Sequence, residues 1–318
     1  MKLFYYCLFV IVISGMFGCG STPYRDDYAQ HQNTLKASDK QLNFTYAFAD
    51  GTDLDIRGSY QPVSNIGSSN MMYAGDAGLI GLIAQIGIHS AAVSSARENQ
   101  LSGQQRVANE HITDLILLGQ KLSLNDLLGD FQPLVSNEAL AAKDVVQIKP
   151  IFFSNPRKTK LYMRMIAWIP KTSKNKRKKA EFVYRNSFEV FLNKISDDDA
   201  QRLVMGDAAF LQEQLSSLLQ MGMYMLIHDV NGEFAQRLKT NKTKAQTFLV
   251  GADDPKAVRG KLVEERCDYQ IVKDLRSWLI ALPVQADTET SATEVLIKTE
   301  PQDLEIQAEK LVKQCNFS

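Results

Sequence analysis

Three long runs rich in β-branched and aromatic residues constrain the fold of this chain more than any other feature. They occupy residues 144–153, 160–170 and 180–192, and short polar connections separate them. Long apolar runs joined by short connections are typical of an antiparallel meander. Within the third run, residues 182–191 alternate in a way that predicts one packed face and one partly wet face.

Helical spacing appears on both sides of these runs. Residues 97–120 follow a helical pattern, with an interruption expected at Gly103. Ser123 is expected to begin a new helix, because Asp126 completes a capping-box pattern with it. Residues 196–232 also read as helical, and Gly232 is the expected C-terminal cap.

The remaining elements complete the predicted fold class. Asp50-Gly51, within short alternating runs, predicts a hairpin, and strands are expected at 245–250, 260–267 and 276–284. Residues 299–315 predict a final helix. This order favours an α+β domain with an antiparallel sheet and helices packed on one face.

The N-terminus has the layout of an export signal. Lys2 precedes the uncharged run 3–13, which breaks at Ser14 and Gly15. A membrane-spanning helix needs about 20 apolar residues, so the run is too short to span. An uncleaved N-terminal anchor and a plain secretory signal remain open alternatives.

Small residues flank Cys19 in the order Gly18-Cys19-Gly20. This arrangement resembles the lipobox of bacterial lipoproteins, in which the signal is cut before the cysteine and the cysteine then carries acyl chains. The resemblance implies a signal peptide over residues 1–18 and a lipid at Cys19. Gly20 stands where Asp would mean retention in the inner membrane, so the resemblance implies a periplasm-facing lipoprotein of the outer membrane.

The segment after Cys19 is polar and nearly free of aliphatic side chains. It cannot bury enough apolar surface to offset the entropy of ordering, so residues 19–40 are expected to form a flexible tether that includes His31. Residues 41–318 then form a single periplasmic domain with ample material for a core.

Two cysteines remain once Cys7 leaves with the signal and Cys19 carries lipid. Because the periplasm is oxidising, we expect Cys267 and Cys315 to form one disulfide. Closing a loop of that length stabilises the fold by about 4 kcal/mol in the chain-entropy model. Two free buried thiols are the alternative.

Charge narrows the range of partners. Lysines plus arginines number 36, as do aspartates plus glutamates, so no global basic field attracts nucleic acid. The run 171–179 is nevertheless strongly basic, which is typical of a hairpin tip that keeps strand edges soluble. Its alternative role is contact with anionic envelope polymers or headgroups, at about 1 kcal/mol per charge. Its positive residues are Lys171, Lys174, Lys176, Arg177, Lys178 and Lys179.

A second hydrophobic segment, residues 77–96, contains no Lys, Arg, Asp or Glu. Its glycines, serines, Gln85 and His89 oppose insertion into hydrocarbon. The pattern predicts a buried helix pressed closely on a sheet. A glycine-zipper-like segment that assembles within a membrane is the alternative.

No motif for catalysis or metal binding appears. The sequence lacks a P-loop, a nucleophile elbow, Cys-x-x-Cys and His-Glu-x-x-His. Its four histidines are scattered singly. The acidic run 197–199 precedes a helical pattern, where carboxylates cap amides, and lacks the ligand spacing of a calcium loop. We therefore predict no catalytic residue, no metal and no cofactor.

Four stretches in this order resemble a widespread family of uncharacterised Gram-negative lipoproteins: the lipobox and residues 78–91, 184–191 and 260–284. The family has no activity to carry over. The resemblance implies a lipid-anchored, non-enzymatic scaffold or accessory of an envelope assembly or transport system, held at the membrane and contacting envelope proteins or polymers. The alternatives are an envelope-polymer hydrolase with paired carboxylates and a lipid- or ligand-binding module.

Overall fold

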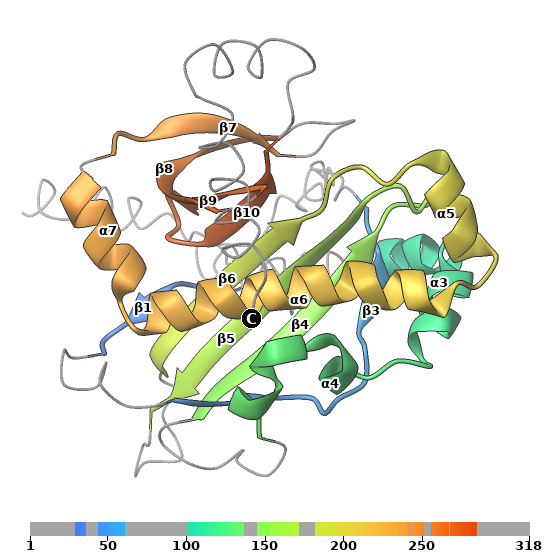
Figure 1. Cartoon of the computed structure of the whole chain (residues 1–318), viewed down its shortest axis with the longest axis horizontal. Helices are drawn as coiled ribbons and strands as arrows, with labels where there is room; N and C mark the ends of the chain where they lie inside the picture. The colour runs from blue at the N-terminus through green and yellow to red at the C-terminus, as the bar shows by residue number, and fades with distance from the viewer. Residues whose placement is uncertain are drawn as a thin grey trace, which may run out of the picture.

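A mixed sheet with helices packed against it forms the body of the protein, which confirms the predicted α+β class (Figure 1). The predictions for the signal peptide, Cys19, the 77–96 helix, most of the basic run, Cys267, Cys315 and the 299–315 helix lie outside the described residues. The computed structural model describes residues 29–35, 44–60, 101–136, 145–171, 182–241, 243–250, 256–266 and 268–284.

The three long runs form the centre of the sheet. They become β4 (Val145–Ser154), β5 (Leu161–Pro170) and β6 (Phe182–Phe191). β5 pairs antiparallel with both neighbours, which confirms the predicted meander.

The sheet extends beyond β6 through a second group of strands. β10 (Leu279–Pro283) pairs parallel with β6, and β9 (Tyr269–Asp274), β8 (Lys256–Arg266) and β7 (Gln246–Val250) follow in antiparallel order. The sheet is therefore mixed and not wholly antiparallel as predicted. The parallel pair arises because α5, α6, α7 and the β7–β9 strands lie between β6 and β10 in the chain.

The opposite edge of the sheet contradicts the predicted Asp50-Gly51 hairpin. β2 (Thr45–Phe48) and β3 (Ile56–Gly58) both pair parallel with β4 instead of with each other. The chain leaves the β4 edge after Phe48, turns at Gly51 with a φ of 87°, and rejoins the same edge at Ile56. Asp50 and Gly51 therefore lie in a loop that joins β2 to β3 along the same edge of β4.

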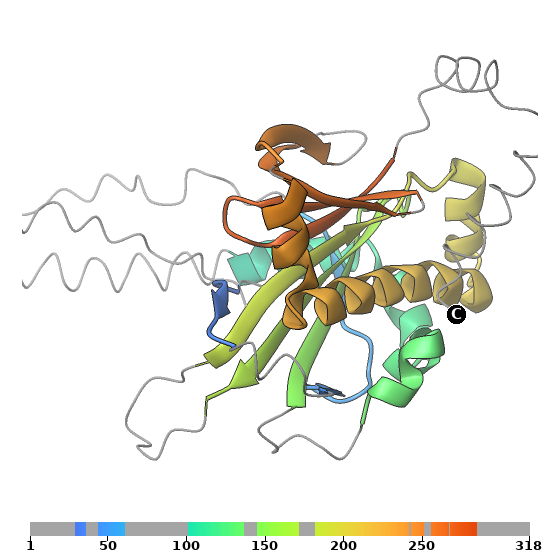
Figure 2. The ribbon, with the colours of Figure 1, turned by 60° about the vertical axis from the view of Figure 1, so that its left-hand side comes forward.

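The long helix α6 (Ala208–Val230) crosses the face of β5 and β6 (Figure 2). Leu215, Leu218 and Leu219 are almost fully buried in the core between the helix and the sheet. At Gly222 the helix approaches β5 so closely that a Cβ atom would collide with the Met163 methyl group. The glycine therefore sets the helix-to-sheet distance.

The predicted helix over residues 196–232 is two helices. α5 (Asp197–Val204) ends before Gly206, whose φ of 85° suits glycine and reverses the chain into α6. Gly232, with a φ of 75°, follows the end of α6 as predicted, and α7 (Glu233–Asn241) begins directly after it.

The earlier helical pattern is interrupted at a different place from the one predicted. Residues 101–110 are helical through Gly103, and the break is a turn at His111–Ile112 before α3 (Thr113–Gly119). A Cβ atom at Gly103 would meet nothing within 4 Å, so no packing contact requires a glycine there. The capping box at Ser123 is confirmed at the start of α4 (Leu124–Leu127), and the 3-10 helix η2 (Gly129–Leu134) follows.

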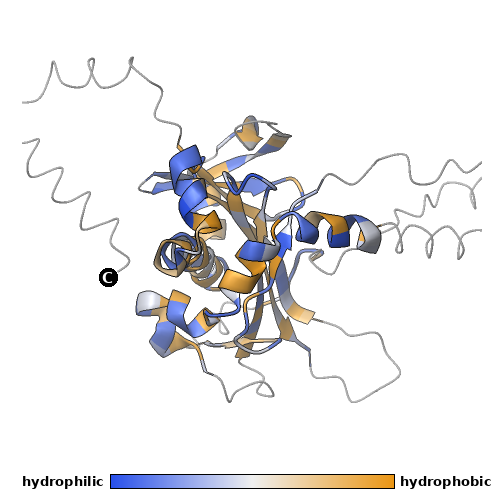
Figure 3. Ribbon diagram, turned by 90° about the vertical axis from the view of Figure 1, so that its right-hand side faces the viewer, coloured by the Kyte–Doolittle hydropathy of each residue, from blue (hydrophilic) through white to orange (hydrophobic). Residues whose placement is uncertain are grey.

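The central strands carry both hydrophobic and hydrophilic residues (Figure 3). The predicted wet face of β6 is nevertheless buried at Ser187 and Glu189. Glu189 pairs with Arg164 of the neighbouring strand, and a ring stack joins Phe153, Tyr162 and Phe191 at centroid distances of 4.8 and 5.2 Å. A central strand carries such a buried carboxylate because an arginine accompanies it.

Candidate functional site

The N-terminal strap, residues 29–35, is docked on the sheet. Its strand β1 (Gln32–Asn33) pairs antiparallel with β6, opposite Arg185 and Tyr184. The Trp278 indole donates a hydrogen bond of 2.7 Å to the Ala29 carbonyl, and Ala29 is 1% exposed. Residues 29–35 fall within the segment predicted as a flexible tether, residues 19–40, and the structure places them against the sheet.

The strap docks because part of the β6 edge needs a hydrogen-bonding partner. β10 pairs only with residues 188–190 of β6. The strap takes the preceding stretch, where the Thr34 amide donates to the Val183 carbonyl at 2.8 Å. Composition alone does not predict the docking of the strap, because the strap is stabilised by backbone hydrogen bonds and by the burial of one residue, Ala29.

A buried polar cluster lies where the strap, β6 and the end of α6 meet. Asp229 is 3% exposed and accepts hydrogen bonds from the Tyr184 hydroxyl at 2.7 Å and the Asn186 amide at 3.0 Å. Burial, followed by the Asp229 charge, raises the pKa of Tyr184 well above its ordinary value. Tyr184 therefore stays a hydroxyl donor.

His31 of the strap is partly buried near this cluster. Burial lowers the pKa of His31, Lys273 lowers it further, and Asp229 and Asn186 oppose the shift. The fold therefore favours the neutral imidazole at this position.

A hollow of about 530 Å³, which we call the α6 groove, lies beside α6. A stripe of α6 forms one side, and the loop before α5 and the β8–β9 turn form the others. The lining residues are Leu192, Asn193, Lys194, Ile195, Ser196, Asp199, Phe210, Gln214, Ser217, Met221, Asp268 and Tyr269.

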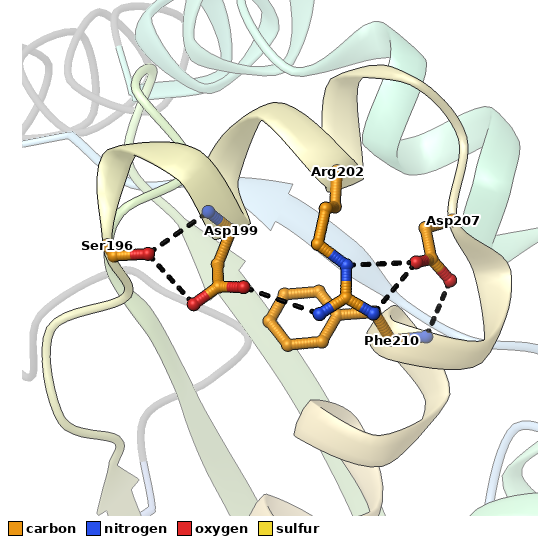
Figure 4. Close-up of polar contacts among 5 residues, drawn as sticks. All are labelled: Ser196, Asp199, Arg202, Asp207 and Phe210. Carbon is orange, nitrogen blue, oxygen red and sulfur yellow. Dashed lines mark hydrogen bonds and ion pairs between the residues drawn. The ribbon is translucent and has the colours of Figure 1, made fainter.

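One end of the α6 groove is fixed by the corner between α5 and α6 (Figure 4). The Ser196 hydroxyl caps α5 by accepting the Asp199 amide at 3.1 Å, and it donates to the Asp199 carboxylate at 2.8 Å. Arg202 bridges Asp199 at 3.3 Å and Asp207 at 2.9 Å, and its guanidinium lies 4.2 Å from the centre of the Phe210 ring.

The same corner shows what the acidic run 197–199 does. All three aspartates lie in the first turn of α5, where carboxylates favour the positive end of the helix dipole. Asp207 caps α6 by accepting the Phe210 amide, and this hydrogen bond, followed by Arg202, lowers the Asp207 pKa. The carboxylates at this corner thus serve the two helix starts.

The other end of the α6 groove is the β8–β9 turn. Asp268 and Tyr269 line it, and the Val284 amide donates to the Asp268 carbonyl at 2.7 Å. Burial raises the pKa of Tyr269 to about 12, so the phenol is neutral. No sequence pattern predicted this groove, because its two sides are far apart in the chain.

The described residues contain no cluster of three or more His, Cys, Asp or Glu side chains that could hold a metal ion. Within the same residues, no helix is long and apolar enough to cross a membrane. Of the basic run, the structure places Lys171, exposed at the end of β5.

Comparisons with protein-family models, with curated proteins and with solved structures found no match.

Proposed function

We propose that this chain is an outer-membrane lipoprotein, acylated at Cys19 and facing the periplasm, that acts as a non-enzymatic accessory through contacts with anionic envelope surfaces and envelope proteins. The sequence features that support it are the lipobox-like Gly18-Cys19-Gly20 and the order of stretches shared with Gram-negative lipoproteins. The structure adds a geometric argument.

The observation that carries the proposal is that the strap and Lys171, the first residue of the basic run, lie at the same end of β6. β1 pairs with Tyr184 and Arg185, and the basic run begins where Pro170 pairs with Phe182. Ala29 follows Cys19 by ten positions, so an extended linker spans at most about 35 Å. A lipid on Cys19 therefore keeps the body, and the basic run with it, near the bilayer.

Such a pairing of acyl chain and basic run has a physical rationale. Stable attachment to a membrane commonly combines a lipid with a polybasic patch. Each lysine or arginine near an anionic surface adds about 1 kcal/mol, so the run would orient the body against headgroups or an anionic polymer.

Vesicle binding tests this proposal. The acylated protein is compared with a variant whose six basic residues in the run become glutamine, and with a charge-conserving control in which Lys and Arg are exchanged there. We expect the neutralised variant to bind more weakly to phosphatidylglycerol-containing vesicles, and the control to bind as the parent does. Equal binding by all three, together with equal recovery of envelope proteins in pull-downs, contradicts the contact role of the run.

The hydrolase alternative requires two carboxylates poised across a cleft. Asp199 lines the α6 groove, but Ser196 and Arg202 engage its carboxylate. This arrangement favours the accessory role over the hydrolase.

A further inference from the structure

The α6 groove presents polar side chains that the rest of the protein does not engage. Among the described residues, the side chains of Asn193, Gln214, Asp268 and Tyr269 make no hydrogen bond or ion pair, and all four line the groove. They come from the loop before α5, from α6 and from the junction of β8 with β9, and each is at least partly exposed. Three separate segments therefore direct unpaired polar groups to one hollow, as in a ligand site.

Buried apolar side chains complete the lining of the groove. Ile195, Phe210 and Met221 are 6%, 8% and 1% exposed. The groove thus combines an apolar base with amide and hydroxyl groups, which both donate and accept hydrogen bonds. A matching ligand needs apolar surface together with several hydroxyl or amide groups.

The charges around the groove balance. Lys194, Asp199 and Asp268 are the charged lining residues, and Arg202 pairs with Asp199 at 3.3 Å (Figure 4). Two positive and two negative side chains therefore surround the hollow, which favours an uncharged ligand. An acyl chain fits poorly, because it would cover the unpaired polar groups without bonding to them.

The size of the groove suits a short chain of sugars. Phe210 and Met221 lie eleven positions apart on α6, which corresponds to about 16 Å along the helix. The volume of about 530 Å³ falls in the range of about 300–1,000 Å³ that is typical of small-ligand sites. Sugar hydroxyls match the unpaired groups, and an acetamido group supplies both a methyl for the apolar base and an amide for Gln214.

We propose that the α6 groove is a binding site for a neutral oligosaccharide whose sugars carry acetamido groups. The sugar hydroxyls pair with Asn193, Asp268 and Tyr269. The acetamido group pairs with the Gln214 amide, and its methyl packs on the apolar base. This site is separate from the basic run and does not require the acyl anchor.

Calorimetric titration of the purified full chain with the N-acetylglucosamine trimer tests the site. Maltotriose, which has hydroxyls but no acetamido groups, is the comparison sugar. We expect saturable one-to-one binding of the N-acetylglucosamine trimer and at least fivefold weaker binding of maltotriose.

Two substitutions separate ligand contacts from structural ones. Tyr269→Phe and Gln214→Leu each remove a polar group that bonds to no described residue, so both variants should keep the urea midpoint of the parent. Each should bind the trimer about fivefold more weakly, because one hydrogen bond to the ligand is lost. Gln212→Leu is the matched control on the same helix. Gln212 is not among the lining residues and donates to the Asp126 carbonyl at 3.3 Å, so this variant should keep the parent's affinity for the trimer.

Four results would overturn the proposal. The first three are no saturable binding of the trimer at millimolar concentration, equal affinity for maltotriose, and unchanged trimer affinity in both groove variants. The fourth is tighter binding of a lysine tripeptide than of the trimer, weakened by the same two substitutions, which would assign the groove to a cationic peptide. Failure of vesicle binding leaves the sugar titration unaffected, so the two proposals are tested separately.

Discussion

Replacing Tyr184 with phenylalanine should destabilise the protein because it removes a hydrogen bond to the buried carboxylate of Asp229. Tyr184 is 0% exposed, and its hydroxyl donates to Asp229, which is 3% exposed, over 2.7 Å. A hydrogen bond to a charged group contributes about 1.5–3 kcal/mol, and the ring itself is kept. We therefore expect Tyr184→Phe to lower the free energy of unfolding by about 2 kcal/mol.

Urea unfolding, followed by tryptophan fluorescence, measures this loss at pH 7, and an unchanged m-value shows that the unfolded state is comparable. Tyr46→Phe is the matched control. Tyr46 is 3% exposed, and no hydrogen bond from its hydroxyl is found among the described residues. We expect that control to change stability by less than about 1 kcal/mol. Equal losses in the two variants would refute the assignment of the energy to the Asp229 contact.

Three further perturbations test other contacts. Trp278→Phe removes the hydrogen-bond donor to the Ala29 carbonyl, which should cost about 1 kcal/mol of local stability. Hydrogen exchange at the Thr34 amide should then be about fivefold faster. An unchanged exchange rate would contradict strap docking. Folding lowers the pKa of His31, so its contribution to stability is present above the ordinary histidine pKa near 6.5 and is lost as the pH falls through the lower folded value. His31→Gln should therefore flatten this part of the curve of unfolding free energy against pH. An unchanged slope would exclude His31 as its source. Gly222→Val should cost about 1–3 kcal/mol in urea unfolding by pushing against Met163, and Met163→Ala should recover part of that loss; additive losses would argue against the close approach.

Local sequence patterns predicted the elements whose stability is local. The meander of β4, β5 and β6 followed from long apolar runs, and the start of α4 from Ser123 and Asp126. β9 was not predicted because the segment 269–274 is short and Lys273 interrupts its apolar pattern. It forms because β8 and β10 both supply backbone partners.

Structural features that depend on pairing between distant segments could not be predicted from local sequence patterns. The parallel pairing of β2 and β3 with β4, and the docking of the strap, join segments far apart in the chain. Polar composition predicted a flexible tether that includes residues 29–35, and the structure places these residues on the sheet through the Trp278 indole and through backbone pairing with β6. The α6 groove likewise arises where residues 192–221 meet residues 268–269.

Intact-mass analysis of the mature protein, purified from the membranes of the organism that encodes it, tests the proposed lipid anchor at Cys19 most directly. We expect a chain that begins at Cys19 and carries acyl groups on that residue. A chain that retains residues 1–18, or one that begins after residue 18 without any acyl group, would contradict it.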